Sequence, residues 1–231
     1  MNKPGIRIID GYEHIVYDPK TYSEEEMLKR SHDLYSMASK RRSVRHFSDR
    51  EVPGEVLLNL IRTAGTSPSG ANKQPWTFCL VADKGLKHKI RLAAEEEEYQ
   101  SYHERMGKEW LDDLKPLGTD WRKPFLETAP WLIVVFRKIY DISQEGRKKN
   151  NYYVTESVGL ACGMLLLAIQ NAGLSALTHT PSPMNFLTSI LDRPENEKPF
   201  LLIPIGYAAE DTYVPHIHRK DLDEICVMYK G

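Results

Sequence analysis

Cysteine is scarce in this sequence. Its three cysteines, Cys79, Cys162 and Cys226, are odd in number and lie far apart in apolar surroundings. Such spacing argues against a disulfide framework and against a cysteine-based metal site. We therefore expect a protein of a reducing compartment.

An excess of charge of one sign is also missing. The chain has 31 Lys and Arg residues against 32 Asp and Glu residues. Because these charges nearly balance, the protein has no overall electrostatic field that would attract nucleic acid or an anionic membrane surface. Any recognition of a charged partner must therefore be local.

Long hydrophobic runs are absent as well. The longest apolar stretch, around Met164–Ile169, is too short to cross a bilayer, and Met1–Gly5 lacks the apolar run of a signal peptide. We expect a cytoplasmic protein with no membrane partner. With 231 residues, 41% of them hydrophobic, the chain is long enough for one core, so residues 1–231 are expected to form a single domain.

Three arginines stand within five residues near the start of this domain. The segment reads Arg41, Arg42, Ser43, Val44, Arg45. Guanidinium groups match phosphate oxygens through paired hydrogen bonds, so the segment predicts a clamp for a phosphorylated small molecule. A solvated basic face is the alternative interpretation.

A turn of small and chain-breaking residues follows about twenty-five residues later. Its residues are Pro68, Ser69, Gly70, Ala71, Asn72, Lys73, Gln74, Pro75 and Trp76. Gly70 allows close approach of the backbone, and the N–H groups between the prolines can point at a polar ligand. The two segments together indicate a flavin mononucleotide (FMN) site, although either alone has an ordinary structural explanation.

Hydrophobic periodicity indicates a mixed α+β domain. Ser23 and Glu26 form a capping-box pattern at the start of a helix expected over residues 24–39. Further helices are expected over residues 54–65, from about residue 85 and over 155–171, and strands over 76–82, 132–136, 174–177, 200–205 and 222–229. The helix over 155–171 is apolar around most of its circumference, so it is either buried or part of an interface.

The order of the arginine segment and the Pro68–Trp76 turn resembles the nitroreductase-like flavoproteins. A later stretch, with Glu95–Glu98, Tyr102 and Lys123, is similar to the substrate lid of the iodotyrosine deiodinases in that superfamily. The resemblance implies a nitroreductase-like fold with a central, mostly antiparallel sheet flanked by helices. It also implies an intertwined homodimer whose C-terminal arms are exchanged.

The resemblance implies FMN as the cofactor. The implied FMN-binding residues are Arg41, Arg42, Ser43, Val44, Arg45, Pro68, Ser69, Gly70, Thr178, His179, Thr180 and Arg219. The Thr180 hydroxyl is implied to bond flavin N5, which favours one-electron steps. His179 stands where animal relatives tend to have another Thr, and we expect no catalytic role for it. The histidines beside Arg219 lack a convincing ligand set, so no metal is expected.

Glu98, Tyr102 and Lys123 define the expected substrate. Glu98 and Tyr102 are four residues apart and so share one face of a helix. A zwitterion suits these groups, with Glu98 for its ammonium, Lys123 for its carboxylate and Tyr102 as an adjustable partner. An acidic run alone would more often be a solvated face. The polar segment 96–117 is expected to be a mobile lid that a ligand orders.

We therefore expect FMN-dependent reductive dehalogenation of halogenated tyrosines, such as iodotyrosine to tyrosine plus iodide, by single-electron steps. The N–H of Ala71 would meet the substrate's phenolate oxygen and stabilise its charge, so Ala71 and Thr180 are the expected catalytic residues. The reductant would be NAD(P)H or an unidentified donor, because the start of the chain departs from the membrane-anchored animal relatives. Two alternatives remain open: a general FMN-dependent nitroreductase or quinone reductase, and a non-catalytic flavin or halotyrosine binding protein.

Overall fold

The computed structural model describes residues 5–230. The chain forms two units, Met1–Lys40 and Arg41–Gly231. Each unit is described by itself below.

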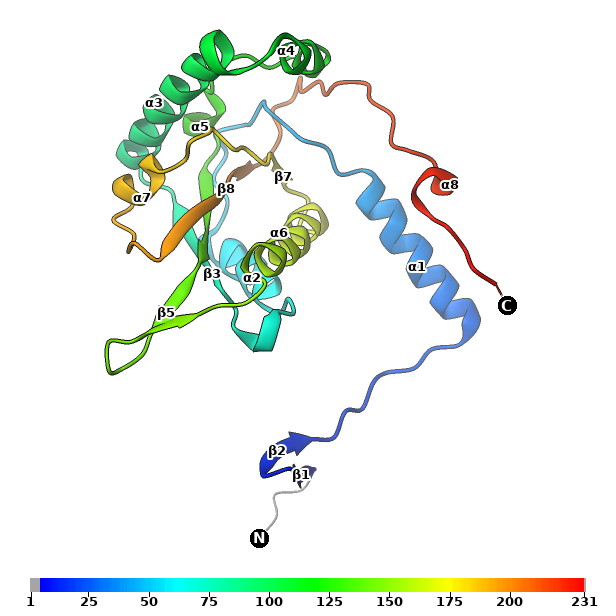
Figure 1. The fold of residues 1–231 in the computed structure, drawn as a ribbon. Helices are drawn as coiled ribbons and strands as arrows, with labels where there is room; N and C mark the ends of the chain where they lie inside the picture. Colours follow the sequence, from blue (N-terminus) through cyan, green and yellow to red (C-terminus); the bar gives the residue numbers. More distant parts are fainter. Residues whose placement is uncertain (1–4, 231) are drawn as a thin grey trace. The chain divides into compact units, whose positions relative to one another are not determined.

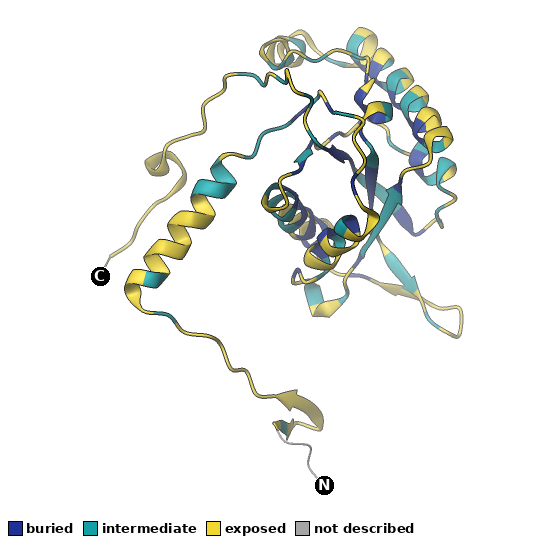
Figure 2. Ribbon diagram, turned by 180° about the vertical axis from the view of Figure 1, so that it is seen from behind, coloured by how far each residue is buried: buried dark blue, intermediate teal, exposed yellow. Residues whose placement is uncertain are grey.

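The first unit contains a small hairpin and one helix. Its elements are β1 (Ile6–Ile9), β2 (Tyr12–Ile15) and α1 (Glu24–Ser39). The expected helix is confirmed, and its N-cap is Ser23, whose Oγ accepts the N–H of Glu26 at 3.3 Å. The Glu26 carboxylate instead pairs with Arg30, at 2.6 Å. No residue of α1 is buried within the described chain, as Figure 2 shows by colour.

The second unit is built on a four-stranded antiparallel sheet with the order β3-β4-β8-β7. Its strands are β3 (Trp76–Val81), β4 (Trp131–Lys138), β7 (Ser175–Ala176) and β8 (Glu197–Gly206). The predicted antiparallel sheet is confirmed. A separate hairpin, β5 (Tyr140–Ile142) and β6 (Lys148–Asn150), was not predicted.

Helices cover both faces of this sheet (Figure 1). One face carries α2 (Gly54–Gly65) and α6 (Val154–Asn171), and the other carries α3 (Lys84–Gln100), α5 (Phe125–Thr128) and α7 (Phe186–Ile190). By length and composition α6 could cross a membrane. Its buried residues, which include Val158, Leu165 and Ile169, pack in the same core cluster as α2 and the sheet.

Strand β4 divides the hydrophobic core into two clusters. Successive side chains of a strand point to opposite faces. Leu132, Val134 and Phe136 therefore pack with α3, α5 and α7, while Ile133 and Val135 pack with α2 and α6. All five are fully buried. The run 132–136 is continuously apolar because its side chains are buried on both faces of the sheet, as the prediction of a buried central strand required.

The predicted C-terminal strand over 222–229 is wrong. The structure has a short helix there, α8 (Leu222–Ile225). Asp221 and Glu224 form a capping box, each side chain bonded to the other residue's backbone N–H, which starts a helix where alternation indicated a strand. The apolar side chains of this arm, including Ile225, Val227 and Met228, are exposed (Figure 2).

Candidate functional site

A cavity of about 200 Å³ lies between the end of α3, the helical segment after it and the segment after β7. Its lining residues are Arg45, Glu98, Tyr102, Met106, Trp110, Leu114, Thr119, Lys123, Phe125, Leu177, Thr178, His179 and Thr180. All three predicted substrate-binding side chains, Glu98, Tyr102 and Lys123, are among them. The fold therefore brings together groups that are far apart in the sequence.

Glu98 and Lys123 form a buried ion pair in this cavity. The Nζ of Lys123 lies 3.3 Å from Oε2 of Glu98, and their side chains are only 4% and 11% exposed, in that order. Burial raises the pKa of the Glu98 carboxyl and lowers the pKa of the Lys123 ammonium, while each partner's charge opposes these shifts. Lys123 also donates to Thr119 Oγ1 at 3.4 Å and to the carbonyl of Asp120. The cavity thus presents one negative and one positive group side by side.

Tyr102 reaches the same cavity from a π-helical turn. This turn, η2 (Ser101–Arg105), continues α3 and is followed by α4 (Lys108–Leu114) and η3 (Lys115–Leu117). A π-helical turn rotates the side chains after it relative to a regular helix, and such turns are frequent at functional sites. The Tyr102 hydroxyl donates to the carbonyl of Thr119 at 3.3 Å. Burial raises the pKa of the Tyr102 hydroxyl, so it is present as a neutral donor and acceptor.

The predicted lid, residues 96–117, is largely helical in the structure. It comprises the end of α3, then η2, α4 and η3, and it contributes several apolar side chains to the cavity. Its mobility stays a prediction.

His179 lies between two threonines that face the cavity. The three residues follow β7, and His179 forms an antiparallel bridge with Leu202 of β8. Thr178 and Thr180 are exposed, while the His179 side chain is buried. Its Nε2 atom has no hydrogen-bond partner in the described part of the chain and lies 4.0 Å from Oε1 of Glu98. Burial, together with the charges of Lys123 and Arg45, lowers the pKa of His179 to about 3, so the ring is neutral.

Three arginines from opposite ends of the second unit meet elsewhere on its surface. Arg219 donates to the carbonyl of Arg41 at 2.9 Å, and Arg42 donates to the carbonyl of Pro215. Burial and the nearby charges of Arg219 and Arg42 lower the pKa of Arg41. Within residues 5–230, neither Arg41 nor Arg42 forms an ion pair with a carboxylate. The guanidiniums of Arg41 and Arg42, which pair with no carboxylate in these residues, fit a phosphate group.

The rest of the arginine segment is divided between core and cavity. Ser43 forms a parallel bridge with Ala176 of β7, and the N–H of Val44 donates to the carbonyl of Ala176 at 3.1 Å. The Val44 side chain is buried in the core, so any contact it makes with a cofactor would be through its backbone. Arg45 lines the cavity. The segment therefore links the arginine group to the cavity around Glu98.

The Pro68–Trp76 turn has an unusual backbone. Ala71, Asn72 and Gln74 have φ angles of 49°, 52° and 48°, a region that non-glycine residues rarely adopt. Hydrogen bonds hold the turn: the N–H groups of Asn72 and Gln74 donate to the carbonyl and to the Oγ of Ser69, respectively. None of the bonds in this turn uses the N–H of Ala71, which is itself an exposed residue. That group is available to a ligand.

Glycine is required at position 70 because Tyr152 and Tyr153, just before α6, lie against its backbone. A Cβ atom at this position would lie 2.8 Å from Cδ2 of Tyr153 and 3.1 Å from the carbonyl oxygen of Tyr152. The Gly70 N–H also reaches Oγ of Ser157, near the start of α6, at 3.4 Å. The predicted close backbone approach at Gly70 is thus made by the chain itself.

Within one copy of the chain, the turn and the cavity are separate. None of the residues Pro68–Trp76 lines the cavity. The turn instead contacts Tyr152, Tyr153 and Ser157 at the start of α6, on the other face of the sheet from α3. One copy of the chain therefore does not assemble the whole predicted site.

Comparisons with known proteins match this geometry. The chain matches the nitroreductase family over residues 38–207. An iodotyrosine deiodinase of Haliscomenobacter hydrossis is 59% identical over 215 residues, covering 93% of this chain and 97% of that protein. The chain belongs to the nitroreductase family, and within it to the iodotyrosine deiodinases.

Further deiodinases agree. Human iodotyrosine deiodinase 1 is 48% identical over 221 residues, covering 94% of this chain and 76% of that protein. A crystal structure of oxidized iodotyrosine deiodinase bound to FMN and 3-iodo-L-tyrosine matches with a TM-score of 0.72 and 34% identity, covering 86% of this chain and 99% of that chain. The predicted family and fold are confirmed.

Several residues of this deiodinase cavity were not predicted as site residues. Thr119 holds both the Tyr102 hydroxyl and the Lys123 ammonium, and Phe125 meets the His179 ring edge to face at 5.8 Å. The only sequence signal for Thr119 is its place after Gly118, whose positive φ of 60° turns the chain back toward α3. Met106 and Trp110 also line the cavity and were not predicted as site residues.

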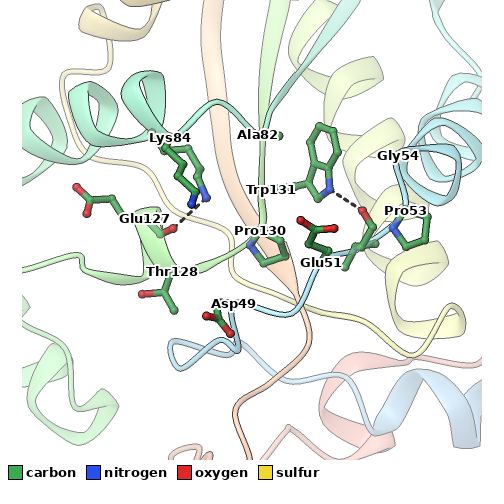
Figure 3. A pocket seen from close by; sticks show the side chains of 12 residues that line it. Asp49, Glu51, Pro53, Gly54, Ala82, Lys84, Glu127, Thr128, Pro130 and Trp131 are labelled. Carbon is green, nitrogen blue, oxygen red and sulfur yellow. Dashed lines mark hydrogen bonds between the residues drawn. The ribbon is translucent and has the colours of Figure 1, made fainter.

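A larger cavity, of about 710 Å³, is drawn in Figure 3, and it shares no lining residue with the cavity around Glu98. It is lined by Asp49, Glu51, Trp131 and the ammonium-bearing Lys84 and Lys87, among others. Lys87 is buried, and its Nζ donates to the carbonyls of Glu127 and Ala129 at 2.9 Å and 2.8 Å, which caps the end of α5. We assign this cavity no part in the site.

Proposed function

We propose that this chain removes halogen from halogenated tyrosines reductively, with FMN as its cofactor, releasing tyrosine and halide. The observation that carries the substrate assignment is the buried Glu98–Lys123 pair in the cavity. A general nitroreductase needs no such pair, whereas an amino-acid substrate has one ammonium and one carboxylate to be matched. Membership of the iodotyrosine deiodinases supports the same assignment.

The substrate's amino-acid end is held by three side chains. Glu98 accepts the ammonium, Lys123 donates to the carboxylate, and Tyr102 adjusts as donor or acceptor. Binding then exchanges one buried ion pair for two, so neither charge is left unpaired in the cavity. This contact would also fasten the lid, residues 96–117, over the bound ligand.

The phosphate of FMN would be held by Arg41, Arg42 and Arg219, with Ser43 and Arg45 continuing toward the cavity. Thr178 and Thr180, both facing the cavity, would lie against its ring system, with the Thr180 hydroxyl as hydrogen-bond donor. When bound, FMN supplies the two electrons of the reaction one at a time. The N–H of Ala71 donates to the phenolate oxygen of the substrate and stabilises the charge on it.

A second copy of the chain would complete the site. Ala71 lies on a turn that does not line the cavity of its own subunit, so the donor to the phenolate would come from the partner subunit. Exposed apolar residues along α6 and along the C-terminal arm, among them Tyr153, Leu160 and Ile225, support a dimer with exchanged arms. A monomer that keeps FMN at low micromolar concentration in sedimentation would contradict this.

The reductant would be NAD(P)H or another donor, and the protein would act in the cytoplasm as a homodimer without a nucleic-acid or membrane partner.

The decisive experiment adds iodotyrosine to dithionite-reduced protein and measures iodide. Repeated release of iodide supports the dehalogenase. Reduction of quinones or nitroaromatics without iodide release would favour the general reductase, and binding without turnover would favour a non-catalytic protein.

A further inference from the structure

The four glutamates of the acidic run at the end of α3 each have a different partner. Glu96 accepts from Gln100 at 2.8 Å and Glu97 from Arg105 at 2.7 Å, both on the outside of the helix. Glu98 pairs with the Lys123 ammonium. Glu95 instead accepts the backbone N–H of Lys123, through Oε1 at 2.6 Å. The run is therefore not a uniform solvated face.

Lys123 is consequently held at both ends by one helix. Glu95 fixes its backbone and Glu98 meets its ammonium, and residues three apart lie on the same helix face. A carboxylate that accepts from a backbone N–H forms a charge-assisted bond, roughly twice as strong as a neutral one. The Glu95 side chain is 12% exposed, so water competes weakly for it. The segment Thr119–Lys123 contains no helix or strand, so this bond fixes the position of the Lys123 backbone relative to α3.

Glu95 is itself fixed by a line of charges that runs toward α5. Arg91 donates through Nε to Oε1 of Glu95 at 2.9 Å and through Nη1 to Glu127 at 3.3 Å. His88 lies 2.7 Å from the other oxygen of Glu127. Glu127 belongs to α5, which starts two residues after Lys123, and it borders the larger cavity (Figure 3). Arg91 thus ties α3 to the chain on the far side of Lys123.

We propose that Glu95 is a positioning residue for the substrate's carboxylate: it places the backbone of Lys123 so that the ammonium reaches into the cavity. The proposal rests on the proposed function, in which Lys123 binds that carboxylate. Glu95 does not line the cavity. It acts only through Lys123.

Two ligands separate this role from a general effect on the fold. Iodotyrosine has a carboxylate, and 3-iodotyramine, the same molecule without it, gains nothing from Lys123. In the FMN-loaded protein, Glu95→Ala should weaken iodotyrosine binding roughly tenfold, as expected for loss of one charge-assisted bond. Binding of 3-iodotyramine should change less than twofold. Glu55→Ala, the same change at an exposed position of α2, serves as the matched control and should change neither.

Lys123→Met provides the reference, because it should also weaken only iodotyrosine. The double variant Glu95→Ala/Lys123→Met should bind iodotyrosine no more weakly than Lys123→Met, since Glu95 acts through that side chain. If Lys123→Met binds iodotyrosine normally, the carboxylate contact of the proposed function is wrong. If Lys123→Met fails and Glu95→Ala does not, only the role of Glu95 is wrong. Equal loss of both ligands in Glu95→Ala also overturns that role.

Should Glu95→Ala not fold, Glu95→Gln decides the question. Its amide oxygen can still accept the Lys123 N–H but without the charge. We expect an intermediate loss of iodotyrosine affinity and unchanged 3-iodotyramine affinity. The double variant Glu95→Gln/Arg91→Met also removes the Arg91 side chain that holds residue 95. If this variant binds iodotyrosine normally, the proposal is wrong.

Discussion

Nε2 of His179 lies 4.0 Å from Oε1 of Glu98, while Nζ of Lys123 lies 3.3 Å from Oε2 of the same carboxylate. Glu98 therefore stands between a cation and a neutral ring. The ring is neutral because burial and the charges of Lys123 and Arg45 lower the pKa of His179 to about 3. Of the two neighbours, only Lys123 compensates the charge of Glu98.

This arrangement predicts a pH dependence of stability. The pKa of His179 in the folded protein, about 3, lies below its ordinary value of 6.5. Below about pH 6.5, His179 therefore binds a proton in the unfolded chain but stays neutral in the folded protein. The contribution of the neutral ring to the free energy of unfolding is complete above that pH and is lost as the pH falls toward 3. Between about pH 7 and about pH 5.5, the wild type should lose about 1 kcal/mol more than His179→Gln. Urea unfolding at both pH values measures this, and parallel losses in the two proteins would contradict it.

Glu98→Gln and Lys123→Met test whether these two side chains bind the ammonium and the carboxylate of the substrate. Each removes one charged partner and should reduce iodotyrosine affinity by about one to two orders of magnitude, roughly 1.4–3 kcal/mol. FMN content should not change, and reduction of a nitroaromatic without an amino-acid group should persist. Flavin fluorescence titration measures the affinity. If both variants bind and dehalogenate iodotyrosine like the wild type, the general reductase becomes the better assignment.

Arg41→Ala and Arg42→Ala test the phosphate site. Loss of one charge-assisted contact should cost about 1.5–3 kcal/mol of FMN binding, a tenfold to hundredfold loss of affinity. Arg50→Ala is the control, because its guanidinium stacks on the Tyr207 ring at 4.1 Å and belongs to no predicted site. Dialysis followed by the absorbance of retained flavin is the measurement. A wild-type protein that is colourless and ignores added FMN would remove the basis of the whole assignment.

Gly70→Ala tests the turn that presents Ala71. The added Cβ would meet the Tyr153 ring at 2.8 Å and the backbone carbonyl oxygen of Tyr152 at 3.1 Å, so the turn or the segment before α6 must move. Iodide release should fall at least tenfold, because the Ala71 N–H no longer meets the phenolate oxygen. Gly65→Ala, with nothing within 4 Å of the new Cβ, should keep full activity. Equal activity of the two variants would show that the turn has no part in catalysis.

Limited proteolysis tests the lid. Cleavage between Glu96 and Leu117 should slow when iodotyrosine is added to the FMN-loaded wild type, because the ligand connects the lid to the rest of the site. The protection should be much smaller in Glu98→Gln. Cleavage that iodotyrosine leaves unchanged would mean that ligand binding does not order this segment.

Local signals predicted most of the fold. Ser23 as an N-cap predicts the start of α1, and the apolar run of β4 predicts the central strand. Alternation failed in the C-terminal arm, where the capping box of Asp221 and Glu224 starts a helix. The β5–β6 hairpin has strands of only three residues, too short for a periodic pattern to be recognised.

The site was predictable in its residue types but not in its arrangement. Spacing alone placed Glu98 and Tyr102 on one face, yet no pattern indicated that Tyr102 lies in a π-helical turn. Thr119 is an ordinary residue in a turn, and its two hydrogen bonds depend on where the chain returns. The separation of the Ala71 turn from the cavity is a property of the sheet's two faces, which sequence order does not reveal.

The left-handed backbone of Ala71, Asn72 and Gln74 has a consequence for binding. Such conformations cost free energy and persist only where surrounding contacts enforce them, here the hydrogen bonds to Ser69 and the packing of Gly70 against Tyr153. The turn is therefore preorganised: the ordering of the Ala71 N–H occurs when the chain folds. A ligand that accepts from this N–H does not bear that entropic cost again, so its affinity is higher than a flexible loop of the same composition would allow.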